Sequence, residues 1–131
     1  MVPKPDMLRS ALGRVRGLGS AKEGTHHWWQ QRLTAVALIP LSIWLIASIV
    51  SLSSAGYAGF ASWFHNPIHA TVMILFLLAV FHHAQLGLQV VIEDYVPNHA
   101  ARTVCVVAAK FACIALAVSC VVSILVVAFK G

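Results

Sequence analysis

Three long apolar runs dominate the pattern of hydrophobic and polar positions along the chain. They cover about residues 33–53, 68–92 and 103–129. Each run reaches or exceeds the roughly 20 residues that a helix needs to cross the hydrocarbon core of a bilayer. The pattern therefore predicts an all-α membrane protein. Residues 33–131 would form a three-helix transmembrane anchor, and residues 1–32 a basic arm with an interfacial segment.

Composition agrees with this class. The 131 residues are 60% hydrophobic and only 10% charged, and the mean hydropathy is +0.84. A water-soluble domain of this size would need more polar residues to cover its surface. The formal net charge is +5. Because the excess positive charge lies beside a membrane span, lipid or another subunit is the expected partner, and nucleic acid is not.

The distribution of charge predicts the orientation of the chain. The loop at residues 54–67 contains no Lys, Arg, Asp or Glu. Positive side chains instead precede or open the first span: Lys4, Arg9, Arg14, Arg16, Lys22 and Arg32. The positive-inside rule then places the N-terminus on the inner side and the C-terminus outside. A mitochondrial transit peptide is the alternative interpretation of the Arg- and Ser-rich arm.

The second span carries ionisable groups that are costly in a membrane and therefore mark a candidate site. His82 and His83 are adjacent, so they point in different directions on a helix. Ala79 and Gly87 lie four residues on either side of His83 and share its face. Small residues there would leave a flat slot suited to a haem ring, but would equally permit close helix packing. A hydrogen-bonded structural histidine and a proton relay remain alternatives.

Asp94 and Tyr95 lie about 18 Å from His83, toward the inner surface, if the helix continues that far. A phenol at this depth could donate a hydrogen bond to a quinone carbonyl, with the adjacent carboxylate orienting it. The alternative is a tyrosine of the interfacial aromatic belt beside solvated acids.

The first span opens with a histidine pair and two tryptophans, which we expect at the inner interface after a turn at Gly24 or Thr25. Arg32 needs an anionic partner or must extend to the surface. The cysteines Cys105, Cys113 and Cys120 lack the close paired spacing of metal ligands. The chain has no motif for an independent covalent reaction.

Taken together, these positions resemble the small hydrophobic membrane-anchor subunit of succinate dehydrogenase, respiratory complex II. The matching residues on the second span are His83, Ala84, Gly87, Asp94 and Tyr95. His26, six residues before Arg32, matches the start of the first helix of that subunit. The basic arm is similar to those of the alphaproteobacterial or mitochondrial branch.

The resemblance implies specific roles for these residues. His83 would be one axial ligand of a b-type haem, with His82 as the alternative if the register shifts by one. His26 and Arg32 would pair with the haem propionates, with His27 as the alternative to His26. Tyr95 would hydrogen-bond ubiquinone, and Asp94 would lie beside it.

The resemblance also implies an assembly. A second three-helix anchor subunit, of the cytochrome b type, would supply the other haem ligand. An iron–sulfur subunit and a flavoprotein subunit would dock on the inner face, and the chain would have no activity of its own. The bacterial cytoplasmic membrane is the expected location, with the mitochondrial inner membrane as the alternative. The competing function is a small transporter or channel component that relays protons.

Overall fold

The computed structural model describes residues 10–13 and 22–130. Residues 11–13 are helical, and residues 22–130 form long helices that are joined by short turns and one small helix. The long helices are α2 (Lys22–Leu52), α4 (Pro67–Tyr95) and α5 (His99–Lys130), and the small one is α3 (Gly56–Phe64). All three long helices are long and apolar enough to cross a membrane. For the described residues, the prediction of an all-helical chain with three candidate membrane spans is therefore confirmed.

The boundaries differ from the sequence-based expectation at several points. Helix α2 begins at Lys22, so the turn expected at Gly24 or Thr25 is wrong, and the helix continues through Pro40. Helix α3 was not expected, because its nine residues lie in what looked like a loop. Most of the basic arm, residues 1–9 and 14–21 with Lys4, Arg9, Arg14 and Arg16, lies outside the described residues.

The helix ends follow from local chemistry. The side chain of Asn66 accepts a hydrogen bond from the backbone N–H of Ile68 (2.9 Å) and caps the start of α4. Pro67 is the first residue of the helix and has no N–H, so it leaves no unpaired donor there. Helix α4 stops at Tyr95, two residues before Pro97, which cannot continue it. The guanidinium Nε of Arg102 then donates to the carbonyl of Val96 (3.0 Å) and ties the turn to α5.

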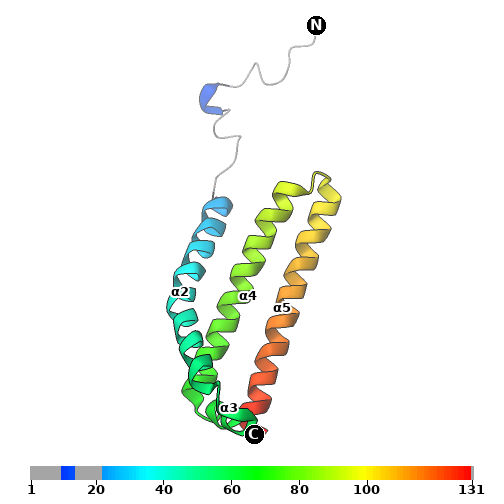
Figure 1. Cartoon of the computed structure of the whole chain (residues 1–131). Helices are drawn as coiled ribbons and strands as arrows, with labels where there is room; N and C mark the ends of the chain where they lie inside the picture. Colours follow the sequence, from blue (N-terminus) through cyan, green and yellow to red (C-terminus); the bar gives the residue numbers. More distant parts are fainter. Residues whose placement is uncertain (1–9, 14–21, 131) are drawn as a thin grey trace.

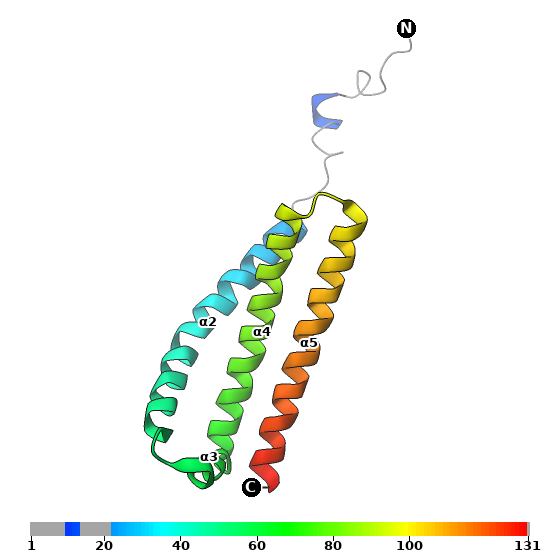
Figure 2. The same ribbon diagram turned by 45° about the vertical axis from the view of Figure 1, so that its right-hand side comes forward.

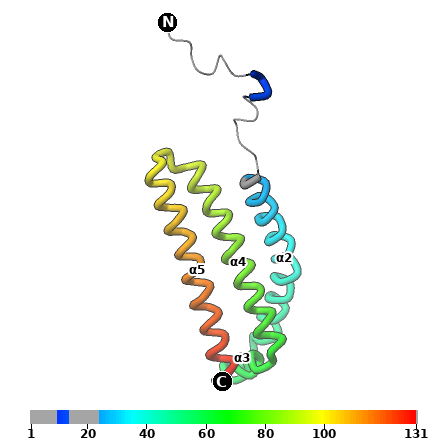
Figure 3. Tube along the Cα trace, turned by 180° about the vertical axis from the view of Figure 1, so that it is seen from behind, coloured from blue at the N-terminus to red at the C-terminus, as the bar shows by residue number. Residues whose placement is uncertain are grey.

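Helix α4 is the central element, because it packs against both α2 and α5. Figures 1 and 2 show it between the other two long helices. The view from behind in Figure 3 shows the start of α2 at the same end as the α4–α5 turn, with α3 at the opposite end. A small core at the α3 end contains Phe64, Ala70 and Ile124.

Most of the apolar surface is exposed. In one apolar 18-residue stretch of each candidate span, the proportion of buried residues is 0%, 6% and 11%. Exposing so much apolar surface to water would be energetically unfavourable, whereas lipid or the helices of a partner would cover it with apolar groups. This burial pattern fits a membrane protein whose helices have much surface left for other molecules.

Candidate functional site

His83 lies where α4 packs against α2, and it contacts two polar side chains of α2. Its Nδ1 lies 3.0 Å from the hydroxyl oxygen of Thr34, and its Nε2 lies 3.4 Å from the amide nitrogen of Gln31. The imidazole is half-buried. Hydrogen bonds between membrane helices contribute about 0.6–2 kcal/mol each. These contacts therefore help to fix α2 against α4 at the level of His83.

Sequence reasoning missed this polar face of α2. His27, Gln31 and Thr34 follow one another at intervals of four and three residues, so they share one side of the helix. Two of their polar atoms, Nε2 of His27 and Oε1 of Gln31, are buried with no hydrogen-bond partner. The three-four spacing of polar residues at the entrance to an apolar span was the signal that could have revealed this face.

Gly87, one turn from His83 on α4, also faces Gln31 of α2. A Cβ added to Gly87 would lie 3.6 Å from the side-chain nitrogen of Gln31, which is an ordinary contact distance. Gln31 therefore lies beside both Gly87 and His83. The flat slot that the small residues suggested stays a prediction.

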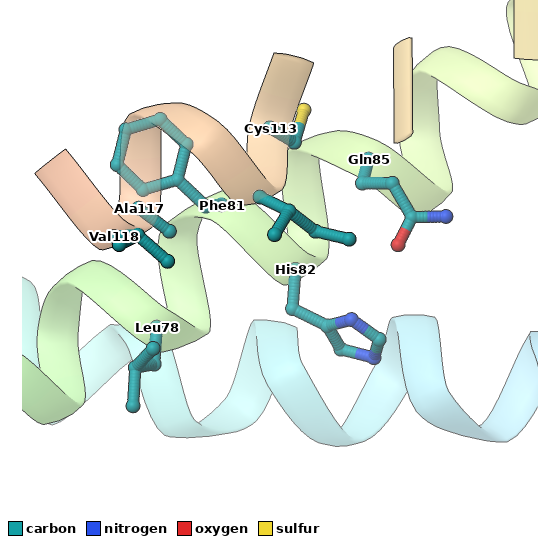
Figure 4. Close-up of a pocket in the computed structure, with 8 residues that line it drawn as sticks. Leu78, Phe81, His82, Gln85, Cys113, Ala117 and Val118 are labelled. Atoms are coloured by element: carbon teal, nitrogen blue, oxygen red, sulfur yellow. The ribbon is translucent and has the colours of Figure 1, made fainter. Parts of the chain in front are cut away.

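His82 has different surroundings. It is exposed and lines a hollow of about 200 Å³ between α4 and α5, with Cys113 and Ala117 of α5 among the other walls. Figure 4 shows that His82 and Gln85 are the nitrogen-bearing members of an otherwise mostly apolar lining. The two adjacent histidines therefore do not belong to one site.

Arg32 and His26 are both exposed. The guanidinium of Arg32 lies 5.4 Å from the ring centre of Trp28, within the range of a cation–π interaction. Within the described part of the chain, Arg32 forms no ion pair. Its positive charge is therefore available to an anion from outside this chain, while the tryptophan holds the side chain at the edge of the span.

Asp94 and Tyr95 close the last turn of α4. Both are exposed, and Tyr95 retains 82% of its surface. Because the helix is continuous from His83, they lie about 18 Å along its axis from that residue. The neighbouring Glu93 accepts a hydrogen bond from Gln89 (2.8 Å), so this acid is held against its own helix. Helix α4 therefore carries two separate stations, one at His83 and the other at Asp94 and Tyr95.

The histidine at the α3 end of the bundle, His69, differs again. His69 stacks on Trp63 with 4.2 Å between ring centres, and its Nδ1 lies 3.0 Å from the carbonyl oxygen of Trp63. This histidine has a packing role at the α3 end of the bundle. Among the described residues, no group of three or more His, Cys, Asp or Glu side chains could hold a metal ion.

Comparison with known proteins identifies a family that this chain matches over most of its length. Residues 7–126 match the model of the succinate dehydrogenase/fumarate reductase transmembrane subunit. A succinate dehydrogenase hydrophobic membrane anchor subunit of Rickettsia bellii is 31% identical over 117 residues, which cover 89% of this chain and 94% of the relative. The subunit of the same name from Rickettsia conorii is 30% identical over 125 residues, covering 95% and 97%.

A more partial match supports the same assignment. The succinate dehydrogenase hydrophobic membrane anchor subunit of Paracoccus denitrificans is 34% identical over 84 residues, covering 62% of this chain and 63% of the relative. No solved structure matches the chain. The family match extends over all three long helices and over both stations on α4. The chain therefore belongs to the succinate dehydrogenase/fumarate reductase transmembrane subunit family.

Proposed function

We propose that the chain anchors a succinate:quinone oxidoreductase in the membrane, supplies one axial ligand of a b-type haem, and forms part of the ubiquinone site. The observation that carries this proposal is the family match over residues 7–126. His83, Asp94 and Tyr95 all lie within this range. His83 would serve haem ligation, and Asp94 and Tyr95, at the other station on the same helix, would serve quinone binding.

The surroundings of His83 fit an axial ligand. Among the described residues, the imidazole has hydrogen-bonding contacts with the neutral side chains of Gln31 and Thr34 and with no charged side chain. The buried, unpartnered atoms of His27 and Gln31 on the facing helix are typical of a polar site that another group completes. A bound haem would supply reversible one-electron chemistry. In this chain, His83 would hold the haem through a ring nitrogen.

The second axial ligand would come from another chain. Among the described residues, no second histidine bonds or stacks with His83, and His69 instead contacts Trp63 at the other end of the bundle. A haem shared with a second three-helix subunit also accounts for the apolar surface that this chain leaves exposed. Arg32 and His26 would hold the propionates, because both are exposed on α2 and Arg32 forms no ion pair with the described residues.

The quinone site would lie at Tyr95. Its exposed hydroxyl can donate a hydrogen bond to a quinone carbonyl. The exposed Asp94 carboxylate beside it can take a proton from water and pass it to the reduced quinone, which gains two protons on becoming quinol. Exposure of both residues fits a pocket whose remaining walls belong to the other subunits. Ubiquinone is the proposed substrate at this position.

The distribution of Lys and Arg fits the proposed orientation. The start of α2 and the α4–α5 turn lie at the same end of the bundle (Figure 1). Lys22 begins α2, and Arg102 lies in the first turn of α5. The opposite end carries Lys130 beside α3. We therefore place the N-terminus, Tyr95 and the docked iron–sulfur and flavoprotein subunits on the inner side of a bacterial cytoplasmic membrane, or of the mitochondrial inner membrane, with the C-terminus outside.

Purification of the complex through a tag on this chain tests the proposal. We expect a flavoprotein, an iron–sulfur protein and a second hydrophobic chain to co-purify, and the reduced-minus-oxidised spectrum to show a b-type haem. A preparation with neither flavoprotein nor haem would overturn the proposal. If that preparation moved protons across vesicles, it would instead support the transporter alternative.

A further inference from the structure

The Thr34 hydroxyl is placed between three hydrogen-bonding groups. Its oxygen lies 2.8 Å from the carbonyl oxygen of Gln30, 3.1 Å from that of Gln31 and 3.0 Å from Nδ1 of His83. Thr34 and His83 are both partly buried and belong to different helices, 49 residues apart in sequence. The hydroxyl therefore joins the backbone of α2 to the imidazole on α4.

The hydrogen atoms in this group can be assigned by elimination. Two backbone carbonyl oxygens, which only accept, lie within reach of the Thr34 hydroxyl, so we assign its single hydrogen to the backbone of its own helix. The hydroxyl oxygen then meets Nδ1 of His83 as an acceptor, which requires that Nδ1 carries the hydrogen. In a neutral imidazole the other nitrogen, Nε2, is left with a lone pair.

A second contact is compatible with this assignment. The side-chain nitrogen of Gln31 faces Nε2 at 3.4 Å. With the amide in this orientation its nitrogen donates, and Nε2 accepts. The assignment of the tautomer therefore rests on the Thr34 contact, and the Gln31 contact agrees with it. His83 thus presents an unprotonated Nε2, opposed only by a long and therefore weak amide contact.

We propose that Thr34 is a positioning residue for His83, which fixes the imidazole in the tautomer and ring orientation needed for axial ligation through Nε2. This inference rests on the proposed function, in which His83 binds the haem iron. Histidine ligands commonly donate their second ring N–H to an acceptor that orients the ring and raises its basicity. Thr34 is that acceptor here, and its own hydrogen bond to the α2 backbone keeps it from acting as a donor.

The position in the membrane makes this contact important. Without Thr34, no water from the bilayer core could replace the acceptor. The Nδ1–H would then lack its partner, and the ring would be free to turn or to change tautomer. A less basic ligand also stabilises ferric iron less well. We therefore expect loss of the hydroxyl to raise the midpoint potential of the haem and to weaken its retention.

The test compares the complete complex with Thr34→Val, which keeps the side-chain shape but removes the hydroxyl, and Thr34→Ser, which keeps the hydroxyl. Thr103→Val is the matched control. Its hydroxyl also bonds the carbonyl four residues back, at 3.0 Å, but contacts no histidine ring. The measurements are the haem midpoint potential, the low-spin ferric EPR signal, and the rate of haem transfer to a scavenging apoprotein.

We expect Thr34→Val to shift the potential upward and to speed haem loss about 10- to 100-fold. Thr34→Ser and Thr103→Val should match the parent complex. An unchanged potential, EPR signal and loss rate in Thr34→Val would overturn the inference. If Thr34→Val does not assemble, Thr34→Ala is measured in its place. A raised potential with faster haem loss would then support the inference, and unchanged values would overturn it. Retention of the full haem signal in His83→Ala would overturn the proposed ligand itself, so the two failures are distinguishable.

Discussion

His82 and His83 are adjacent in the sequence, yet they lie in different environments. His83 contacts Thr34 and Gln31 of α2, whereas His82 lines the hollow between α4 and α5. A helix turns by about 100° per residue, so one imidazole points to the facing helix and the other does not. This difference assigns the two histidines different roles, although their side chains are chemically the same.

His82→Ala should leave the haem in place. The side chain is exposed and forms no hydrogen bond within the described residues, so its removal disturbs neither the ring of His83 nor the α2 contact. The ratio of haem to flavin in the purified complex measures this. A parental ratio in His82→Ala is the expected result, and a haem-free complex would mean that the register of the site is shifted by one residue.

Tyr95→Phe should slow succinate:quinone reductase activity while the haem content stays at the parental level. The change removes one hydroxyl that can donate a single hydrogen bond, which contributes about 0.5–1.5 kcal/mol. We therefore expect kcat/KM for the quinone to fall by about 2- to 13-fold. Succinate oxidation with a soluble dye acceptor provides the control, because it bypasses the quinone. Lost haem with unchanged quinone turnover would contradict the separation of the two stations.

Gly87→Ala and Gly87→Leu form a matched pair that tests the slot beside His83. An added Cβ would meet Gln31 at 3.6 Å, so alanine should be accommodated with a parental haem content. Leucine extends further and would have to displace the amide or the imidazole, at about 1–3 kcal/mol for overpacking. Haem retention should therefore fall several-fold in Gly87→Leu alone. Equal spectra for the two variants would show that nothing is bound against Gly87.

Arg32→Leu should weaken haem retention more than Arg32→Lys. The guanidinium lies over Trp28, without an ion pair in the described part of the chain, and its proposed partner is a propionate. Loss of a charged hydrogen bond of about 1.5–3 kcal/mol corresponds to roughly a tenfold to hundredfold faster release. Lysine keeps the charge but not the planar fork, so its effect should be intermediate. Transfer of haem to apomyoglobin measures the rates, and equal rates in all three proteins would remove Arg32 from the site.

The sequence contained much of the fold. Three apolar runs gave three spans because a membrane helix must satisfy its backbone internally and present apolar side chains along its full length. Helix α3 was not predicted, because the nine residues at 56–64 are too few to cross a membrane and too apolar to show the pattern of an amphipathic helix. Gly56, with φ at +61°, provides the turn into it.

The candidate site was less accessible to sequence reasoning. The interval from His83 to Tyr95 is local to one helix, so its length followed from helix geometry alone. The contact between Thr34 and His83 joins residues 49 positions apart. It depends on which face of α2 meets α4, and apolar residues on nearly every side of a membrane helix hide that choice. The rest of the proposed site would lie on other chains.

The most direct test of the central claim is the redox spectrum of the complex that carries His83→Ala, recorded beside His82→Ala. The flavoprotein and the iron–sulfur protein should still co-purify with both variants, which shows assembly. We predict that the low-spin spectrum of a haem with two histidine ligands disappears in His83→Ala and persists in His82→Ala. A full two-histidine spectrum in an assembled His83→Ala complex would contradict the account.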